Sequence, residues 1–151
     1  AFWMLGADFA QVKWPACGEI DIMEYRGQNP RELIGTAHGP GYSGGAGVGA
    51  GYENPYGEAF SDDFHVYAIE WEPEEIRWYV DDVHYLTRYS SQWYSDGAPG
   101  NPLAPFDQPF FIILNVALGG TLGGFISPDL EFPVYMYVDH VRVYQQVDAD
   151  Q

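Results

Sequence analysis

Three carboxylates fall within six residues of one short segment, at Glu19, Asp21 and Glu24. The segment is rich in strand-forming residues, and side chains on a regular strand alternate between its two faces. Glu19 and Asp21 therefore share one face, while the isoleucines between and after them point to the other. Glu24 has the wrong parity for the acidic face, and one extra residue, a β-bulge at 22–23, would return it there.

Several carboxylates on one face are electrostatically costly, because like charges at close range resist ionising together. Glycoside hydrolysis uses such a row: one carboxylate attacks the sugar, and a second, kept protonated, gives its proton to the leaving oxygen. In retaining enzymes the two groups lie about 5–5.5 Å apart, a separation that a bulged strand can offer. An acidic edge strand or part of a calcium site would use the same residues, so the carboxylates alone leave the function open.

Composition restricts the class of partner. The 151 residues are enough for one domain with a core of its own, and 1–151 is treated as a single domain. Lys and Arg number 6 against 22 Asp and Glu, which gives a formal charge of -16. That charge repels nucleic acid and anionic membranes and disfavours strongly anionic polysaccharides, whereas a neutral glycan is compatible with it.

The single cysteine, Cys17, excludes an intrachain disulfide and is expected to be a small buried side chain. The sequence contains no leader-like segment and no apolar run of 18 residues, so we expect a soluble chain.

Period-two alternation and turn residues predict an all-β sandwich. The strands are expected at 1–6, 18–25, 32–38, 63–71, 75–80, 83–89, 109–118 and 133–144, with no helix longer than a turn or two. A hairpin should turn at Asp81-Asp82. The glycine- and tyrosine-rich segment 39–61 is expected to be a long surface loop. The run 109–118 is apolar apart from Asn115, which predicts a buried strand that must be covered on both sides.

The residues around the acids are similar to a known signature. Glu-Ile-Asp-Ile-Met-Glu at 19–24, preceded by Trp-Pro-Ala-Cys-Gly at 14–18, resembles glycoside hydrolase family 16, in the bulged form of its laminarinase branch, the endo-β-1,3-glucanases. The resemblance continues in the family's order through 1–6, 35–44, 63–71, 105–120 and 138–144. It therefore covers nearly the whole chain.

This resemblance implies a β-jelly-roll sandwich of the concanavalin A-like type, with a concave substrate-binding sheet. It implies that Glu19 is the nucleophile, Glu24 the acid and then the base, and Asp21 a hydrogen-bonding neighbour that tunes the nucleophile. The substrate would be a neutral β-1,3-glucan of the laminarin type, cleaved internally with retention by double displacement. No cofactor is required for this catalysis, and a polymer-degrading enzyme is expected outside the cell or in the periplasm. The oligomeric state is left open.

Four further residues are candidates for binding substrate. Trp14 precedes the acidic strand, and an indole offers both a stacking face and an N–H donor. His38 is expected to hydrogen-bond substrate and not to bind metal, because no second His or Cys has ligand spacing to it. Trp3 is balanced between a substrate contact and the core. Asn115, the one amide in an apolar strand, must be hydrogen-bonded and is a candidate for facing the cleft.

The other tryptophans and one aspartate complete the candidates. Trp71 and Trp78 are expected in the core, and Trp93 is left open between core and surface. Family members often hold a structural calcium with the residue that matches Asp139. Its partner ligands would come from N-terminal strands that are absent from this sequence.

Two departures from the family keep alternatives open. The sequence starts on a motif that lies mid-domain in the family, so it is expected to hold the C-terminal part of the fold as a partial sandwich. Residues 121–124 read Thr-Leu-Gly-Gly where many relatives carry Asn-Trp-Pro-Gly. A non-catalytic β-glucan-binding fragment and a hydrolase of mixed-linkage β-1,3-1,4-glucan are the alternatives, and the three retained acids favour an enzyme.

Overall fold

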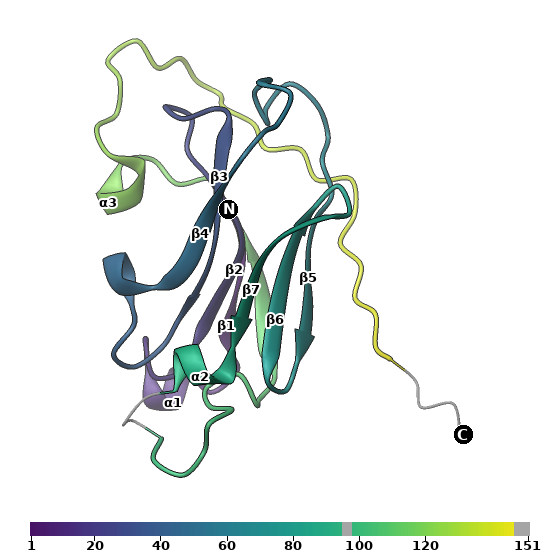
Figure 1. The fold of residues 1–151 in the computed structure, drawn as a ribbon. Coiled ribbons are helices and arrows are strands. Elements are labelled where there is room, and N and C mark those ends of the chain that lie inside the picture. The colour runs from purple at the N-terminus through teal and green to yellow at the C-terminus, as the bar shows by residue number, and fades with distance from the viewer. Residues whose placement is uncertain (95–97, 147–151) are drawn as a thin grey trace.

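Two antiparallel sheets packed face to face make up the computed structural model, which describes residues 1–94 and 98–146 (Figure 1). The first sheet has the strand order β4-β3-β2-β1-β8 and the second has β5-β6-β7. The strands are β1 Phe2–Gly6, β2 Glu19–Tyr25, β3 Glu32–His38, β4 Val48–Glu53, β5 Tyr67–Glu72, β6 Glu75–Val80, β7 Val83–Tyr89 and β8 Phe110–Leu114. The predicted all-β sandwich is confirmed.

The described helices are short, as expected: α1 Phe9–Val12, η1 Gly44–Ala46, α2 Ser90–Trp93 and α3 Gly120–Gly123. Within the part of the chain that the structure describes, no helix is long and apolar enough to cross a membrane.

The core forms where β2 faces the second sheet. Ile20 and Ile22 pack in one buried cluster with Ile76, Trp78 and Leu86 from β6 and β7. The Trp78 side chain is fully buried, and its Nε1–H donates a 2.8 Å hydrogen bond to the backbone carbonyl of the acidic strand at residue 21. The second sheet therefore holds β2 by both apolar contact and a hydrogen bond.

Gly35 on β3 allows the two sheets to approach closely at this point. A Cβ on residue 35 would lie 2.6 Å from Cδ1 of Trp78 and closer still to the hydroxyl of Tyr85. Because the Trp78 ring is fully buried, it has little room to move away. A glycine is therefore required here by packing and not by backbone conformation.

The predicted hairpin at Asp81-Asp82 is confirmed. The two residues link β6 to β7 with φ angles of 48° and 64°. Positive φ at both central positions is the property of the turn that best matches the twist of paired strands. The Asp81 carboxylate also accepts a 2.8 Å hydrogen bond from the backbone N–H of Val66, and its other oxygen lies 2.7 Å from Nδ1 of His65.

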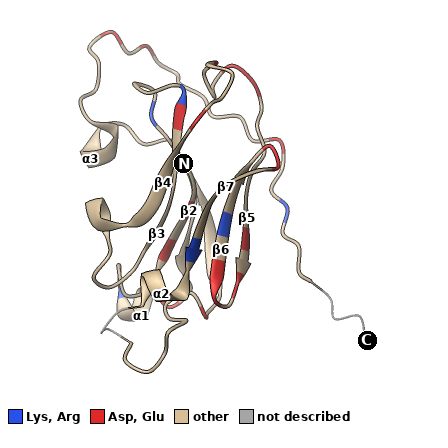
Figure 2. Cartoon of the chain, viewed as in Figure 1, with Lys and Arg blue, Asp and Glu red and all other residues tan. Residues whose placement is uncertain are grey.

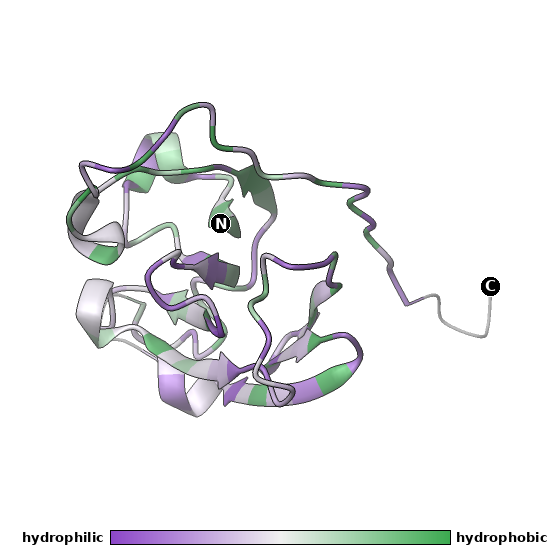
Figure 3. Cartoon of the chain, turned by 90° about the horizontal axis from the view of Figure 1, so that it is seen from above, coloured by the Kyte–Doolittle hydropathy of each residue, from purple (hydrophilic) through white to green (hydrophobic). Residues whose placement is uncertain are grey.

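The predicted strand at 133–144 is wrong. This segment has no ladder partner among the described residues, and it runs along the sandwich and then away from it (Figure 1). It carries hydrophobic stretches, as Figure 3 shows, and most of these side chains are exposed, although Met136 packs against a core cluster. Alternation is a property of the sequence, but a strand also needs a neighbouring strand to satisfy its backbone N–H and C=O groups.

Two other sequence predictions also need correction. Segment 39–61 is not a structureless loop, because it contains η1 and the edge strand β4. β4 escaped prediction because it holds two glycines among its six residues, and glycine is depleted in strands. The run 109–118 is not covered on both sides: only 110–114 form a strand, β8, which lies at the other edge of the sheet. Phe111, Ile112 and Leu114 remain exposed there.

The outcomes for the remaining core candidates differ. Trp78 and Cys17 are fully buried, as predicted. Trp93, which the sequence left open, is also fully buried. The prediction for Trp71 is wrong, because 36% of the residue is exposed. Trp71 lies on β5, which is an edge strand, and its Nε1–H donates to the backbone carbonyl of Phe106.

The acidic composition is spread over both sheets and the loops, with few basic residues among them (Figure 2). One local compensation stands out on the second sheet, where the guanidinium of Arg77 bonds the carboxylates of Glu70, Glu72 and Glu75 at 2.6–2.8 Å. These pairs are largely exposed, so they organise the surface more than they stabilise the fold.

Candidate active site

A β-bulge in β2 brings the three acids onto one face, as the sequence predicted. Asp21 pairs with Thr36 of β3, and Glu24 pairs with Ile34. Three residue steps on β2 therefore oppose two steps on β3, which leaves one extra residue on β2. Because residues two apart on β3 share a face, Asp21 and Glu24 also share a face.

The same bulge explains why two successive apolar residues, Ile22 and Met23, are both buried. Ile22 joins the cluster around Trp78, and Met23 joins a second cluster with Leu33 and Val80. A regular strand would have turned one of these side chains toward the acids. The extra residue thus serves the core and the site together.

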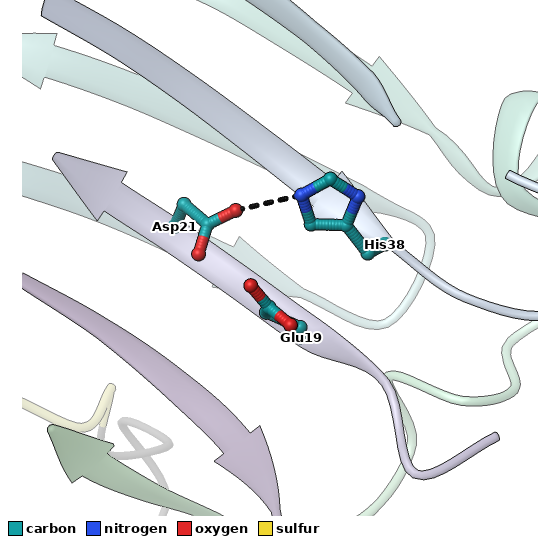
Figure 4. Close-up of side chains that lie close together, drawn as sticks. All are labelled: Glu19, Asp21 and His38. Carbon is teal, nitrogen blue, oxygen red and sulfur yellow. Dashed lines mark ion pairs between the residues drawn. The ribbon is translucent and has the colours of Figure 1, made fainter. Parts of the chain in front are cut away.

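Asp21 is the most enclosed of the three acids, with only 1% of the residue exposed. Its neighbours across the sheet are Trp3 on β1 and Thr36 on β3. One carboxylate oxygen, Oδ2, lies 3.0 Å from Nε2 of His38 (Figure 4). The position of His38 follows from strand register, since it pairs with Glu19 at the end of β3.

Burial and mutual repulsion perturb all three carboxyl groups. Burial, followed by the charge of Glu24, raises the pKa of Asp21 to about 8. Burial and then the charge of Asp21 raise the pKa of Glu19. Burial also raises the pKa of Glu24, against the opposing influence of His38. These directions are the ones expected when like charges are withdrawn from water together.

Glu19 and Asp21 lie within hydrogen-bonding reach of each other, so a proton between them has two possible positions. We place it on Asp21, because that carboxyl is the more deeply buried of the two. Glu19 also accepts a 2.5 Å hydrogen bond at Oε2 from Nε1–H of Trp14, and a donor aimed at a carboxylate favours its charged form. Trp14 therefore opposes the rise in the pKa of Glu19, and Asp21 keeps the higher pKa of the two.

Trp14 also helps to form an open groove beside Glu19. The groove has a volume of about 300 Å³, and its lining consists of Trp3, Leu5, Phe9, Trp14 and Glu19. Trp14 is 43% exposed, which leaves its ring accessible from solvent. An exposed indole beside a carboxylate can hold the apolar face of a sugar next to a reactive group.

Trp3 and Asn115 are joined by a hydrogen bond, which the sequence did not predict. Nε1–H of Trp3 donates to Oδ1 of Asn115 at 2.7 Å. Asn115 follows β8, so the bond connects residues 112 positions apart in the sequence. Trp3 lines the groove, while Asn115 is not among the groove residues and accepts the hydrogen bond of the Trp3 indole.

His38 lies beside the acids, and its hydrogen bond to substrate stays a prediction. The residue is 92% buried and faces Asp21, and it does not line the groove. Its ring lies against Trp14, with the ring centroids 6.4 Å apart. His38 therefore contacts Asp21 directly.

Two groove residues, Leu5 and Phe9, were missed by sequence reasoning. Leu5 pairs with Glu19 across β1 and β2, so strand register would have revealed it once the pairing was known. Phe9 belongs to the four-residue α1 and offered no periodic signal. Its position depends on how the segment between β1 and β2 folds.

The loop before β2 delivers Glu19 to this face. Gly18 has a φ of 78°, a left-handed conformation that favours glycine, and its N–H donates to the carbonyl of Pro15. A Cβ at Gly18 would lie 2.7 Å from Pro105, so packing excludes a side chain as well. The carbonyl of Cys17 accepts a 3.0 Å hydrogen bond from the Gln108 amide.

Asp139 is an exposed residue in the structure. It is in the extended C-terminal segment with 81% of its side chain exposed, 3.3 Å from His140. Within residues 1–94 and 98–146 it belongs to no group of three or more ligand-type side chains. Calcium takes six to eight oxygen ligands, so the described residues do not fit it at this position, and the calcium role stays a prediction.

Comparison with known proteins agrees with this geometry. The family model described as "Glycosyl hydrolases family 16" matches residues 1–120. The chain belongs to this family. It is 44% identical over 148 residues to the Glucan endo-1,3-beta-glucosidase A1 of Niallia circulans, covering 97% of this chain and 22% of that protein. It is 45% identical over 151 residues to the Beta-glucanase of Rhodothermus marinus, covering 98% of this chain and 52% of that protein.

Among solved structures, the endo-beta-1,3-glucanase from Pyrococcus furiosus superposes with a TM-score of 0.78 at 47% identity, covering 88% of this chain and 49% of that one. The chain thus has the jelly-roll sandwich of the family 16 laminarinases and spans about half the length of such relatives, or less. Two less similar relatives have other printed names: a Beta-1,3-glucan-binding protein of Penaeus monodon, 39% identical, and the Endo-1,3-1,4-beta-glycanase ExsH of Rhizobium meliloti, 31% identical.

Proposed function

We propose that this chain carries the catalytic face of a retaining endo-hydrolase of β-1,3-glucan. The observation that supports this most strongly is the bulge in β2, which puts Glu19, Asp21 and Glu24 on one face beside the Trp14 groove. Relatives named as glucan endo-1,3-beta-glucosidase and beta-glucanase support a glucan as substrate. The formal charge of -16 is compatible with a neutral polysaccharide.

In the first step Glu19 attacks the anomeric carbon and forms a covalent glycosyl-enzyme. The bond to the leaving sugar breaks as Glu24 gives its proton to the glycosidic oxygen. In the second step Glu24 takes a proton from water, which attacks the same carbon and releases Glu19. A carboxylic acid must have a raised pKa to stay protonated near neutral pH. Burial raises the pKa of Glu24.

Asp21 and Trp14 prepare the nucleophile. A neutral Asp21 donates to Glu19 without adding a second negative charge, and Trp14 donates to Oε2 of the same carboxylate. When Glu19 forms its ester bond, these donors are left on a weaker acceptor. These hydrogen bonds therefore orient the attacking carboxylate and stabilise the glycosyl-enzyme intermediate less strongly.

Azide rescue tests the assignment of Glu19. The Glu19→Ala variant should lose laminarin hydrolysis by orders of magnitude. With an activated aryl β-laminarioligosaccharide, added azide should restore turnover and give an α-glycosyl azide, because the small anion replaces the missing nucleophile. Glu24→Ala should instead give the β-glycosyl azide. Exchange of these two stereochemical outcomes would reverse the two roles.

A glucan-binding role without turnover is the second candidate, favoured by the relative named as a Beta-1,3-glucan-binding protein. Calorimetry with a laminarin oligosaccharide would support it if the chain bound the sugar and released no reducing ends. Product analysis on a mixed-linkage β-1,3-1,4-glucan would separate the laminarinase from the third candidate, which the ExsH name motivates.

A further inference from the structure

The side chains of Glu19, Asp21 and His38 converge in a way that the hydrolysis does not require. One nitrogen of the imidazole and one oxygen of each carboxyl group all lie within 4.8 Å of one another. In the portion of the chain that the structure describes, this is the one such group of three or more His, Cys, Asp or Glu side chains. The group lies on two paired strands, which fixes its spacing.

The group contains a buried oxygen that lacks a hydrogen-bond partner. Only 2% of the Asp21 side chain is exposed, and its Oδ2 makes no hydrogen bond to any described residue. That oxygen points toward His38 (Figure 4), and the 3.0 Å approach to Nε2 does not complete a hydrogen bond. Buried polar atoms are normally satisfied, so an unsatisfied oxygen aimed into a ligand-type cluster favours the binding of a cation there.

One imidazole nitrogen and two carboxylate oxygens form a ligand set that suits zinc-type ions. Zn²⁺ binds His nitrogen at about 2.0–2.1 Å and carboxylate oxygen at about 2.0–2.2 Å, and non-structural sites often use three protein ligands with one open position. Calcium and magnesium prefer six or more oxygens, which this group does not offer. At those bond lengths tetrahedral ligand atoms lie about 3.3–3.5 Å apart, so small side-chain movements would close the site.

The surrounding residues hold each ligand in place. Trp14 donates to Oε2 of Glu19 and so holds this carboxylate in place. The imidazole of His38 lies against Gly47, where a Cβ would be 2.5 Å from Nδ1. A side chain at position 47 would therefore displace the ring. Nδ1 has no hydrogen-bond partner among the described residues, and the absence of that supporting bond predicts moderate affinity.

We infer that Glu19, Asp21 and His38 form a binding site for a divalent transition metal, of which Zn²⁺ is the model ion. The site stands on geometry alone, while its consequence rests on the proposed function. An ion on Glu19 occupies the lone pair that would attack the sugar, so the bound metal inhibits hydrolysis. Glu24 is not a ligand and stays free.

Calorimetry with Zn²⁺ at pH 8, after removal of trace metal with EDTA, tests the site without requiring turnover. We expect one ion per chain. Glu19→Gln, Asp21→Asn and His38→Gln should each weaken binding at least about 100-fold, the upper end of what supporting-residue changes cost. Gly47→Ala should weaken it about 10- to 100-fold by moving the imidazole.

Two matched controls make the result specific. Glu24→Gln removes a neighbouring carboxylate that is not a ligand, and His140→Gln removes an exposed histidine beside an aspartate. Both should keep one Zn²⁺ site per chain, and Co²⁺ should give visible absorption bands of a tetrahedral ion in both but not in His38→Gln. Circular dichroism checks that each variant is folded.

Undiminished Zn²⁺ affinity in a folded His38→Gln variant would overturn the site, as would loss of binding in His140→Gln alone. If the chain binds Zn²⁺ but hydrolyses no glucan, the metal site is supported and the proposed function is contradicted. If the chain hydrolyses glucan but binds no Zn²⁺, the proposed function is supported and the metal site is overturned.

Discussion

Replacing Asp21 by asparagine should remove a loss of stability that the parent chain suffers as pH rises. The pKa of this carboxyl is raised from 3.8 to about 8 in the folded chain, first by burial and then by the charge of Glu24. Between these two values the folded state keeps a proton that the unfolded state has released. Since the unfolded state binds fewer protons, the free energy of unfolding falls with rising pH in this window.

The size of the effect follows from proton linkage. One proton of difference changes the free energy of unfolding by about 1.4 kcal/mol per pH unit. Between pH 5 and pH 7 Asp21 alone therefore lowers the stability of the parent chain by about 2.7 kcal/mol. Asparagine has nearly the same volume and no charge, so Asp21→Asn lacks this contribution.

Urea unfolding at pH 5, 6 and 7 measures this, with the buried Trp78 and Trp93 as fluorescent reporters and EDTA present to exclude metal. Between pH 5 and pH 7 the free energy of unfolding should fall by about 2–3 kcal/mol less in Asp21→Asn than in the parent chain. The matched control Glu58→Gln, at an exposed carboxylate, should follow the parent. Parallel profiles for the parent and Asp21→Asn would refute the assignment of the retained proton.

Three further outcomes are expected. Trp14→Phe keeps an aromatic ring but loses the N–H that donates to Glu19, so kcat/KM on laminarin should fall about tenfold, the equivalent of one charge-assisted hydrogen bond. An unchanged kcat/KM would mean that this hydrogen bond does not assist the attack. Gly35→Ala should lower the free energy of unfolding by about 1–3 kcal/mol, because the new Cβ overpacks against Trp78. The control Gly27→Ala places its Cβ with no atom within 4 Å and should be close to neutral, and equal effects of the two changes would argue against this packing. The exposed apolar edge at β8 should make the chain bind a hydrophobic dye and self-associate in sedimentation at rising concentration, and a concentration-independent monomer would contradict this.

Much of the site was predictable from residue spacing. Glu19 and Asp21 are two residues apart on a strand, and only an extra residue could bring Glu24 to their face. The Asp81-Asp82 turn was predictable for a similar reason, because a two-residue link between alternating segments has few allowed geometries. Both predictions depend on backbone geometry within a few residues.

Predictions that needed a distant partner were less successful. Segment 133–144 alternates well and still forms no strand, because nothing pairs with it in the structure. The apolar run that ends near Leu118 was expected to be covered on both sides, but β8 is an edge strand with exposed side chains. Trp71 was assigned to the core for the same kind of reason and is partly exposed.

The sequence by itself determined which face of β2 carries the acids, because side-chain direction on a strand is set by local backbone geometry. The tertiary structure decided how those acids behave. Asp21 keeps its proton because β1 and β3 flank it and exclude water, and His38 faces it because the register of β3 pairs residues 19 and 38. Desolvation and register depend on which strands become neighbours, and that is settled only when segments far apart in the chain pack together.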